Sequence, residues 1–132
     1  MTTPSPVPLP PEAKALLDAP EFATVATIEP DGQPQLSVVW IARDGDVPIF
    51  STVPGRRKTD NLERDPRATL LVYPREQPYS YLEVRGSVEI LDDPEGALID
   101  ELSEKYRGVP YQGPAEPRVI VRLLPRKVLW QA

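Results

Sequence analysis

Three adjacent cations, Arg56, Arg57 and Lys58, are the side chains of this sequence whose types and spacing best suit chemistry. They follow the turn signal VPG and begin a segment that Pro66 must end, which predicts a short helix. Adjacent cations repel one another, so in a chain of formal net charge -5 the cluster is either a solvated surface run or a site for an anion. The first N–H groups of a helix lack internal partners and carry partial positive charge, which suits phosphate or carboxylate.

Polar side chains on both sides of the cluster favour the anion site. Ser51 and Thr52 end the preceding predicted strand and supply hydroxyls, and Asn61 lies about one helical turn beyond Lys58. Arg side chains add bidentate, charge-assisted hydrogen bonds to phosphate or carboxylate. Each residue alone has an ordinary structural explanation, at a strand end or on a solvated helix. Together they predict that the cluster binds an anion.

The sequence has no His and no Cys among its 132 residues. This composition excludes disulfide bonds, cysteine nucleophiles, zinc sites built on His or Cys, and a Ser-His-Asp triad. Any chemistry must therefore come from carboxylates, Lys, Tyr or a bound cofactor. With 20 acidic against 15 basic residues, nucleic acid is not expected as the main partner, and the apolar runs are too short to span a membrane. No secretory signal is recognised, so a cytoplasmic protein is expected.

Short β-rich runs separated by sharp turns predict a small antiparallel barrel with helices on its outside, and no βαβ alternation is present. An extended, poorly ordered, proline-rich arm is expected over residues 1–11, ahead of a single domain over 12–132. Gly86 is expected to mark a bend or bulge, and Asp93 to cap a helix with Pro94 at its first position. The six expected strands cover residues 22–28, 35–43, 47–52, 68–73, 79–91 and 118–124, with a short segment after Pro125, and the helices cover residues 12–18, 57–65 and 94–107.

Three segments resemble the split β-barrel flavin and deazaflavin oxidoreductases, a superfamily that includes pyridoxamine 5′-phosphate oxidase. They are FATVATIEPDGQPQLSVVW, STVPGRRKTDNLERDPRATLLV and YLEVRGSVEI, so the resemblance runs from about Phe22 to Leu91. It implies an FMN-binding-like, six-stranded split barrel, mostly β with short helices (α+β). It also implies a homodimer that binds its cofactor at the subunit interface, with the cofactor phosphate on the Arg-Lys segment. Carried over, it makes cofactor residues of Ser51, Thr52, Arg56, Arg57, Lys58 and Asn61.

The resemblance also bears on which cofactor is bound. In the FMN-binding oxidases a basic residue of the second strand meets the FMN phosphate, and the matching residue here is the uncharged Ser37. Those oxidases also have a His in their C-terminal substrate-binding segment, which this chain cannot supply. The segments ATIEPDGQPQLS and RRKTDNLERDPRA look more like the branch that uses the 8-hydroxy-5-deazaflavin coenzyme F-420. Coenzyme F-420 is therefore predicted, with FMN as the alternative.

The mechanism implied by the resemblance is hydride transfer from the reduced deazaflavin ring to an unsaturated small molecule. The protein then positions and shields the ring, because the cofactor carries the difficult chemistry. Val38, Val39 and Trp40 are candidates to lie beside the ring, with barrel core as their alternative. Tyr79 and Tyr81 either border the substrate pocket, from their own or the partner subunit, or are structural. The competing functions are an FMN-binding oxidoreductase of the same fold and a non-catalytic protein that stores or carries a cofactor.

Overall fold

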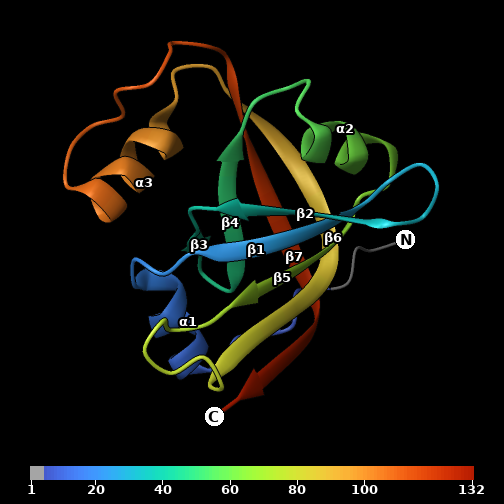
Figure 1. The fold of residues 1–132 in the computed structure, drawn as a ribbon, viewed down its shortest axis with the longest axis vertical. Helices are drawn as coiled ribbons and strands as arrows, with labels where there is room; N and C mark the ends of the chain where they lie inside the picture. The colour runs from blue at the N-terminus through green and yellow to red at the C-terminus, as the bar shows by residue number, and fades with distance from the viewer. Residues whose placement is uncertain (1–4) are drawn as a thin grey trace.

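One antiparallel sheet organises the protein (Figure 1), and the computed structural model describes residues 5–132 of it. The strand order is β2-β1-β5-β6-β7-β4-β3, so β2 and β3 are the two edges and the barrel is not closed. The strands are β1 (Ala23–Ile28), β2 (Pro34–Val39), β3 (Ala42–Asp44), β4 (Val47–Thr52), β5 (Arg67–Val72), β6 (Tyr81–Asp93) and β7 (Arg118–Gln131), and the helices are α1 (Pro11–Asp18), α2 (Arg57–Arg64) and α3 (Ala97–Arg107).

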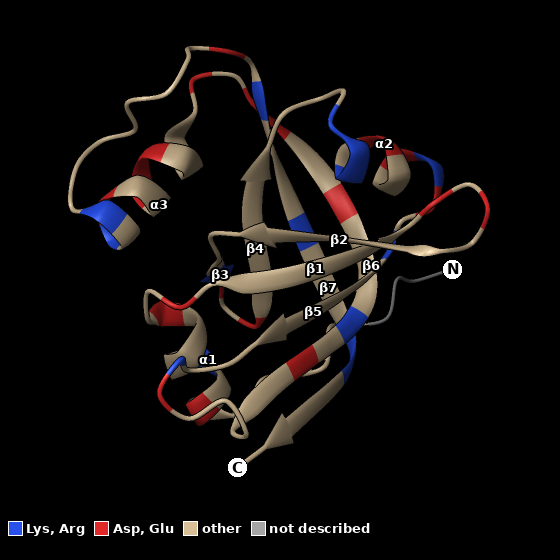
Figure 2. Ribbon diagram, in the orientation of Figure 1, with Lys and Arg blue, Asp and Glu red and all other residues tan. Residues whose placement is uncertain are grey.

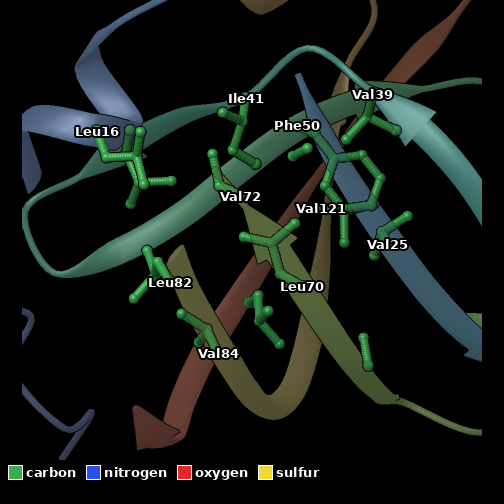
Figure 3. Close-up of a cluster of buried hydrophobic side chains, with 14 of the residues drawn as sticks. Leu16, Val25, Val39, Ile41, Phe50, Leu70, Val72, Leu82, Val84 and Val121 are labelled. Atoms are coloured by element: carbon green, nitrogen blue, oxygen red, sulfur yellow. The ribbon is translucent and has the colours of Figure 1, made fainter. Parts of the chain in front are cut away.

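Alternate residues of the strands fill the inside of the curved sheet, as Figure 3 shows. In β1, Ala23, Val25 and Thr27 are fully buried while the residues between them are only half-buried. Phe50 of β4 is the largest fully buried side chain and packs in the same core as Leu70 of β5. This period of two confirms the predicted mostly-β fold, because successive strand side chains point to opposite faces.

The described residues form seven strands, whereas the sequence analysis expected six. The difference arises at Trp40 and Ile41, where the strand expected over residues 35–43 divides into β2 and β3. β2 pairs with β1 and β3 pairs with β4, so the chain crosses here from one edge of the sheet to the other. Helix α3 satisfies the backbone at the crossing: Ile41 N donates to Tyr106 Oη at 3.0 Å, and Lys105 Nζ donates to Ile41 O at 2.5 Å. A buried strand can leave its ladder only where such partners exist.

Tyr106→Phe is expected to lower the free energy of unfolding by about 1–3 kcal/mol, because it leaves buried backbone groups without a partner. The lost hydroxyl accepts a hydrogen bond from Ile41, which is fully buried, and donates one to Glu21 O at 2.6 Å. Urea unfolding followed by circular dichroism measures the change. Tyr79→Phe is the matched control, because Tyr79 is 82% exposed and should change stability by less than about 0.5 kcal/mol. Equal stability of the two variants would contradict this account of the strand crossing.

The β6–β7 ladder contains the predicted bulge. Its register shifts between Arg85 and Gly86, and a Cβ atom at Gly86 would lie only 2.0 Å from Leu124 O, so only glycine fits there. The sequence analysis ended the last long strand at residue 124, but β7 continues through Pro125 to Gln131. Pro125 faces Gly86 at the irregularity, where the ladder tolerates a residue that has no N–H to donate.

The segments that precede α1 and α3 also differ from the expected boundaries. Within the expected arm, residues 1–4 lie outside the described residues, while Leu9 is buried in the core and donates its N–H to Asp46 Oδ1 at 3.0 Å. The N-cap residue of α3 is Gly96 and not the predicted Asp93, but the Asp93 carboxylate still accepts from the backbone N–H groups of Ala97 and Leu98 at 3.1 and 2.9 Å. Pro94 lies in the turn before the helix instead of at its first position, because Asp93 still belongs to β6 and the chain must reverse first.

Among the described helices, none has the length and apolar character needed to cross a membrane.

Candidate anion-binding site

A cavity of about 220 Å³ lies in the split of the barrel, between the end of β2 and the end of β4. These two strands do not pair with each other, since β2 pairs only with β1 and β4 pairs with β7 and β3. In the view of Figure 1, β4 ends between α2 and α3. The cavity is lined by Phe22, Val38, Val39, Trp40, Ser51, Thr52, Arg56, Lys58, Ile99, Leu102 and Arg118.

One wall of the cavity is cationic. Arg56, Lys58 and Arg118 line it, and no carboxylate is among the lining residues. Figure 2 shows basic residues at the start of α2 and at the start of β7. The half-buried position of Lys58, and then its neighbours Arg56 and Arg118, hold the pKa of its ammonium group below the usual 10.5. Arg56 forms one loose ion pair, in which its Nη2 atom lies 4.0 Å from Glu116 Oε1.

The start of α2 adds backbone donors to this wall. Arg56 is the N-cap residue in an extended conformation, and no side chain caps the helix. The first N–H groups of such a helix keep their capacity to bind an anion, and they add partial positive charge to that of the side chains. Arg56 and Lys58, at the start of α2, line one cavity, and the binding of an anion there stays a prediction.

The rest of the cavity lining is largely apolar. It includes Val38, Ile99 and Leu102, together with the aromatic rings of Phe22 and Trp40. Trp40 stacks on Tyr106 with ring centroids 5.4 Å apart, and Phe22 lies tilted against the same ring at 5.7 Å. These contacts hold the two rings in place, because offset aromatic pairs favour defined geometries. A lining that combines three cations with apolar and aromatic side chains suits a ligand with an anionic group and a flat, weakly polar part.

Five of the nine residues predicted to bind a cofactor line this cavity: Val39, Ser51, Thr52, Arg56 and Lys58. The hydroxyl of Thr52 is buried against Thr59, with the two Oγ1 atoms 3.2 Å apart, so it supports the start of α2. Ser51 points toward β7, where its Oγ accepts a hydrogen bond from Arg118 Nε at 2.8 Å.

Arg57 and Asn61 do not line the cavity. The Nη1 atom of Arg57 lies 3.4 Å from Glu29 Oε2, so its guanidinium is paired with the β1–β2 turn. Asn61 lies on the buried face of α2, where its amide donates to Thr27 Oγ1 at 3.0 Å and its carbonyl oxygen accepts from Arg64 Nη1 at 3.1 Å. Packing of α2 on β1 decides both positions, because it sets how the helix is rotated about its axis.

Ser37 and Tyr79 also lie outside the cavity lining. The Oγ atom of Ser37 is buried without a hydrogen-bond partner among the described residues. Tyr79 lies in the loop between β5 and β6 and is 82% exposed. Their predicted contacts with a cofactor therefore stay predictions, and within a single chain neither side chain reaches the cationic wall.

Arg118 is the charged residue of the cavity lining that the sequence analysis missed; it also missed the apolar Phe22, Ile99 and Leu102. Arg118 is 8% exposed at the first position of β7, with its guanidinium carbon 5.4 Å from the centre of the Tyr111 ring. Sequence spacing carries no signal for it, because Arg118 is 67 positions from Ser51 along the chain. The antiparallel register of β4 with β7, which sets Ser51 opposite Ile120, brings the two together.

A larger cavity, of about 620 Å³, opens elsewhere, between β1, β5 and β6. Three arginines line it, but each already bonds a neighbour: Arg67 with Asp65, Arg85 with Glu83 and Arg126 with Ser87. Arg67 and Arg85 of this larger cavity form close ion pairs at 2.8 and 2.6 Å, whereas among the described residues of the smaller cavity only Arg56 has an acidic partner, at 4.0 Å, so the smaller cavity is the stronger candidate for an anion.

Known proteins resemble this chain in sequence and in fold. Residues 9–131 match the protein family described as pyridoxamine 5′-phosphate oxidase. A solved structure named F420 reductase is 37% identical, covers 92% of this chain and 98% of its own, and superposes with a TM-score of 0.83. The conserved hypothetical protein Rv2991 of Mycobacterium tuberculosis is 28% identical over 99% of this chain and 89% of its own, with a TM-score of 0.77. A putative pyridoxamine 5′-phosphate oxidase from Listeria innocua shares the fold at 17% identity and a TM-score of 0.66, over 83% of this chain and 86% of its own.

Proposed function

Because this chain belongs to the pyridoxamine 5′-phosphate oxidase family, we propose that it is a cytoplasmic oxidoreductase that uses the reduced deazaflavin coenzyme F-420. Its substrate would be an unsaturated small molecule that accepts hydride. The observation that carries the proposal is the cavity wall of Arg56, Lys58 and Arg118, which no carboxylate lines. The similarity to the F420 reductase supports the deazaflavin over FMN.

The residues present fit such a cofactor. Arg56, Lys58 and the N-terminus of α2 would hold its phosphate, through charge-assisted hydrogen bonds. Phe22, Val38 and Trp40 would exclude water from one face of the ring. When bound, the deazaflavin supplies the hydride chemistry, and the chain itself binds, orients and shields. A chain without His or Cys is suited to this role, because positioning requires no nucleophile.

We further propose that a second copy of the chain completes the site. The cavity of about 220 Å³ is smaller than the roughly 300–1,000 Å³ typical of pockets that bury a whole small-molecule ligand. Leu36 and Val38 of the edge strand β2 are 64% and 67% exposed, and Leu129 of β7 is 38% exposed. An isologous dimer would cover these side chains, including Val38, which lines the cavity. Sedimentation equilibrium at micromolar concentration tests this, and a monomer would contradict it.

Fluorescence titration of the purified protein with oxidised and reduced coenzyme F-420, FMN, FAD and riboflavin tests the proposed cofactor. We expect the deazaflavin to bind more tightly than FMN, and riboflavin, which has no phosphate, to bind weakly. Turnover is then assayed with a panel of unsaturated acceptors. Tighter binding of FMN would instead assign an FMN-dependent oxidoreductase, and tight binding without any turnover would assign a cofactor carrier.

Binding of the cofactor is expected to weaken at alkaline pH because of Lys58. Its pKa is below 10.5, so the ammonium group loses its charge earlier than an ordinary lysine as the pH rises. Attraction to the phosphate is complete below the lowered pKa and is lost as the pH rises through it. Dissociation constants measured from about pH 7 upward detect the change. In Lys58→Arg the affinity should stay flat over the same range, because a guanidinium remains protonated.

A further inference from the structure

Arg118 is a buried arginine with an incomplete set of partners. Its side chain is 8% exposed, Nε donates to Ser51 Oγ, and Nη1 is buried without a hydrogen-bond partner among residues 5–132. We infer that Arg118 is a third anion-binding residue of the cavity, an inference that rests on the proposed function. Arg118 would make the site selective for ligands that carry a phosphate. It would act beside Arg56 and Lys58, which line the same cavity.

No carboxylate of the described part of the chain lies within 4.0 Å of the Arg118 guanidinium, although Glu95, Asp100 and Glu116 line a neighbouring cavity of about 180 Å³ that Arg118 also borders. Asp93 is opposite Arg118 in the β6–β7 ladder, but both of its carboxylate oxygens accept backbone N–H groups at the start of α3. Arg122, four residues further along the same strand, lies 2.6 Å from Asp44 Oδ2 and 2.7 Å from Glu89 Oε1. A buried charge without a counterion is costly, so an anion that enters the cavity supplies the partner that Arg118 lacks.

Arg118 is also held in place before any ligand arrives. Ser51 Oγ fixes one edge of the guanidinium, and the Tyr111 ring lies against it at 5.4 Å. Tyr111 is itself anchored through its backbone N–H, which donates to Asp100 Oδ1 of α3 at 3.1 Å. A pre-organised guanidinium loses little conformational entropy when it binds, and its planar fork matches a phosphate group.

The test compares Arg118→Met with Arg126→Met. Both remove one positive charge from β7, but Arg126 does not line this cavity. We expect Arg118→Met to weaken binding of coenzyme F-420 and FMN by about ten- to hundredfold. Riboflavin binding should change less than about twofold, and Arg126→Met should change none of the three by more than that. An equal loss in both variants would overturn the inference, because it would mean a general effect of net charge.

If Arg118→Met does not fold, Arg118→Lys provides the test. A lysine retains the charge but cannot bond Ser51 and a phosphate with one rigid fork, so we expect a loss of about three- to tenfold. Binding of both cofactors within twofold of the parent protein would overturn the inference and leave the proposed function standing. Should the parent bind neither cofactor, the proposed function fails and pyrophosphate becomes the probe. Pyrophosphate should then raise the melting temperature of the parent more than that of Arg118→Lys at the same concentration, and an equal rise, or none in the parent, would overturn the inference as well.

Discussion

Lys58→Ala is expected to weaken the binding of coenzyme F-420 by about ten- to hundredfold, whereas Arg57→Ala should change it by less than about threefold. The two residues are adjacent and carry the same charge, but only Lys58 lines the cavity. Each charge-assisted hydrogen bond to an anion contributes on the order of 1.5–3 kcal/mol. Arg57 is mostly exposed and paired with Glu29, and an exposed ion pair contributes about 0–1 kcal/mol at most.

Fluorescence titration of both variants at one salt concentration measures the difference, and the free energy of unfolding should change little in either. Affinity of the parent protein should also fall as salt is added, because part of the attraction is screened. If both variants bind coenzyme F-420 like the parent protein, the basic stretch over residues 56–58 is not part of the site. A loss in Arg57→Ala as large as in Lys58→Ala would instead mean that net charge matters and cavity geometry does not.

Phe50→Ala should lower the free energy of unfolding by about 3–5 kcal/mol, the largest stability change expected here. The Phe50 side chain is 1% exposed and lies in the core shown in Figure 3, so its removal leaves a cavity in addition to lost burial. Domains of this kind are stable by only about 5–15 kcal/mol, and such a loss is a large share of the total. Urea unfolding at fixed protein concentration measures it, since a dimer would make stability concentration-dependent.

Cofactor affinity separates this core effect from an effect on the site. Phe50 does not line the cavity, and Thr52, which lies on the same face of β4 and does line it, keeps its own contact with Thr59. Below the melting temperature, Phe50→Ala should therefore bind coenzyme F-420 within about threefold of the parent. Phe50→Leu is the matched control, and it should lose less than half as much stability because most of the buried volume remains. A full loss of binding in folded Phe50→Ala would mean that the core and the cavity are coupled.

The local sequence was sufficient to predict the helix and the strands around the site. The strand β1, the short helix between VPG and Pro66, and the bulge at Gly86 were all predicted, because each depends on residue composition or backbone preference within a few residues. The clustering of the cations with Ser51 and Thr52 at one strand end was predicted for the same reason. Five of the nine predicted site residues consequently line one cavity.

Tertiary packing decided the rest. Which of the adjacent cations faces the cavity depends on the rotation of α2, and burial of Thr59, Asn61 and Leu62 sets that rotation. The division of β2 from β3 depends on hydrogen bonds from α3, more than 60 residues away, and no local preference encodes them. Arg118 reaches Ser51 only because β7 pairs with β4 in one register, across a separation of 67 residues. The sequence by itself thus determined that a cluster of cations follows the end of a strand. Long-range strand pairing decided which charges meet there, because contacts between distant residues follow from the assembled core and not from local spacing.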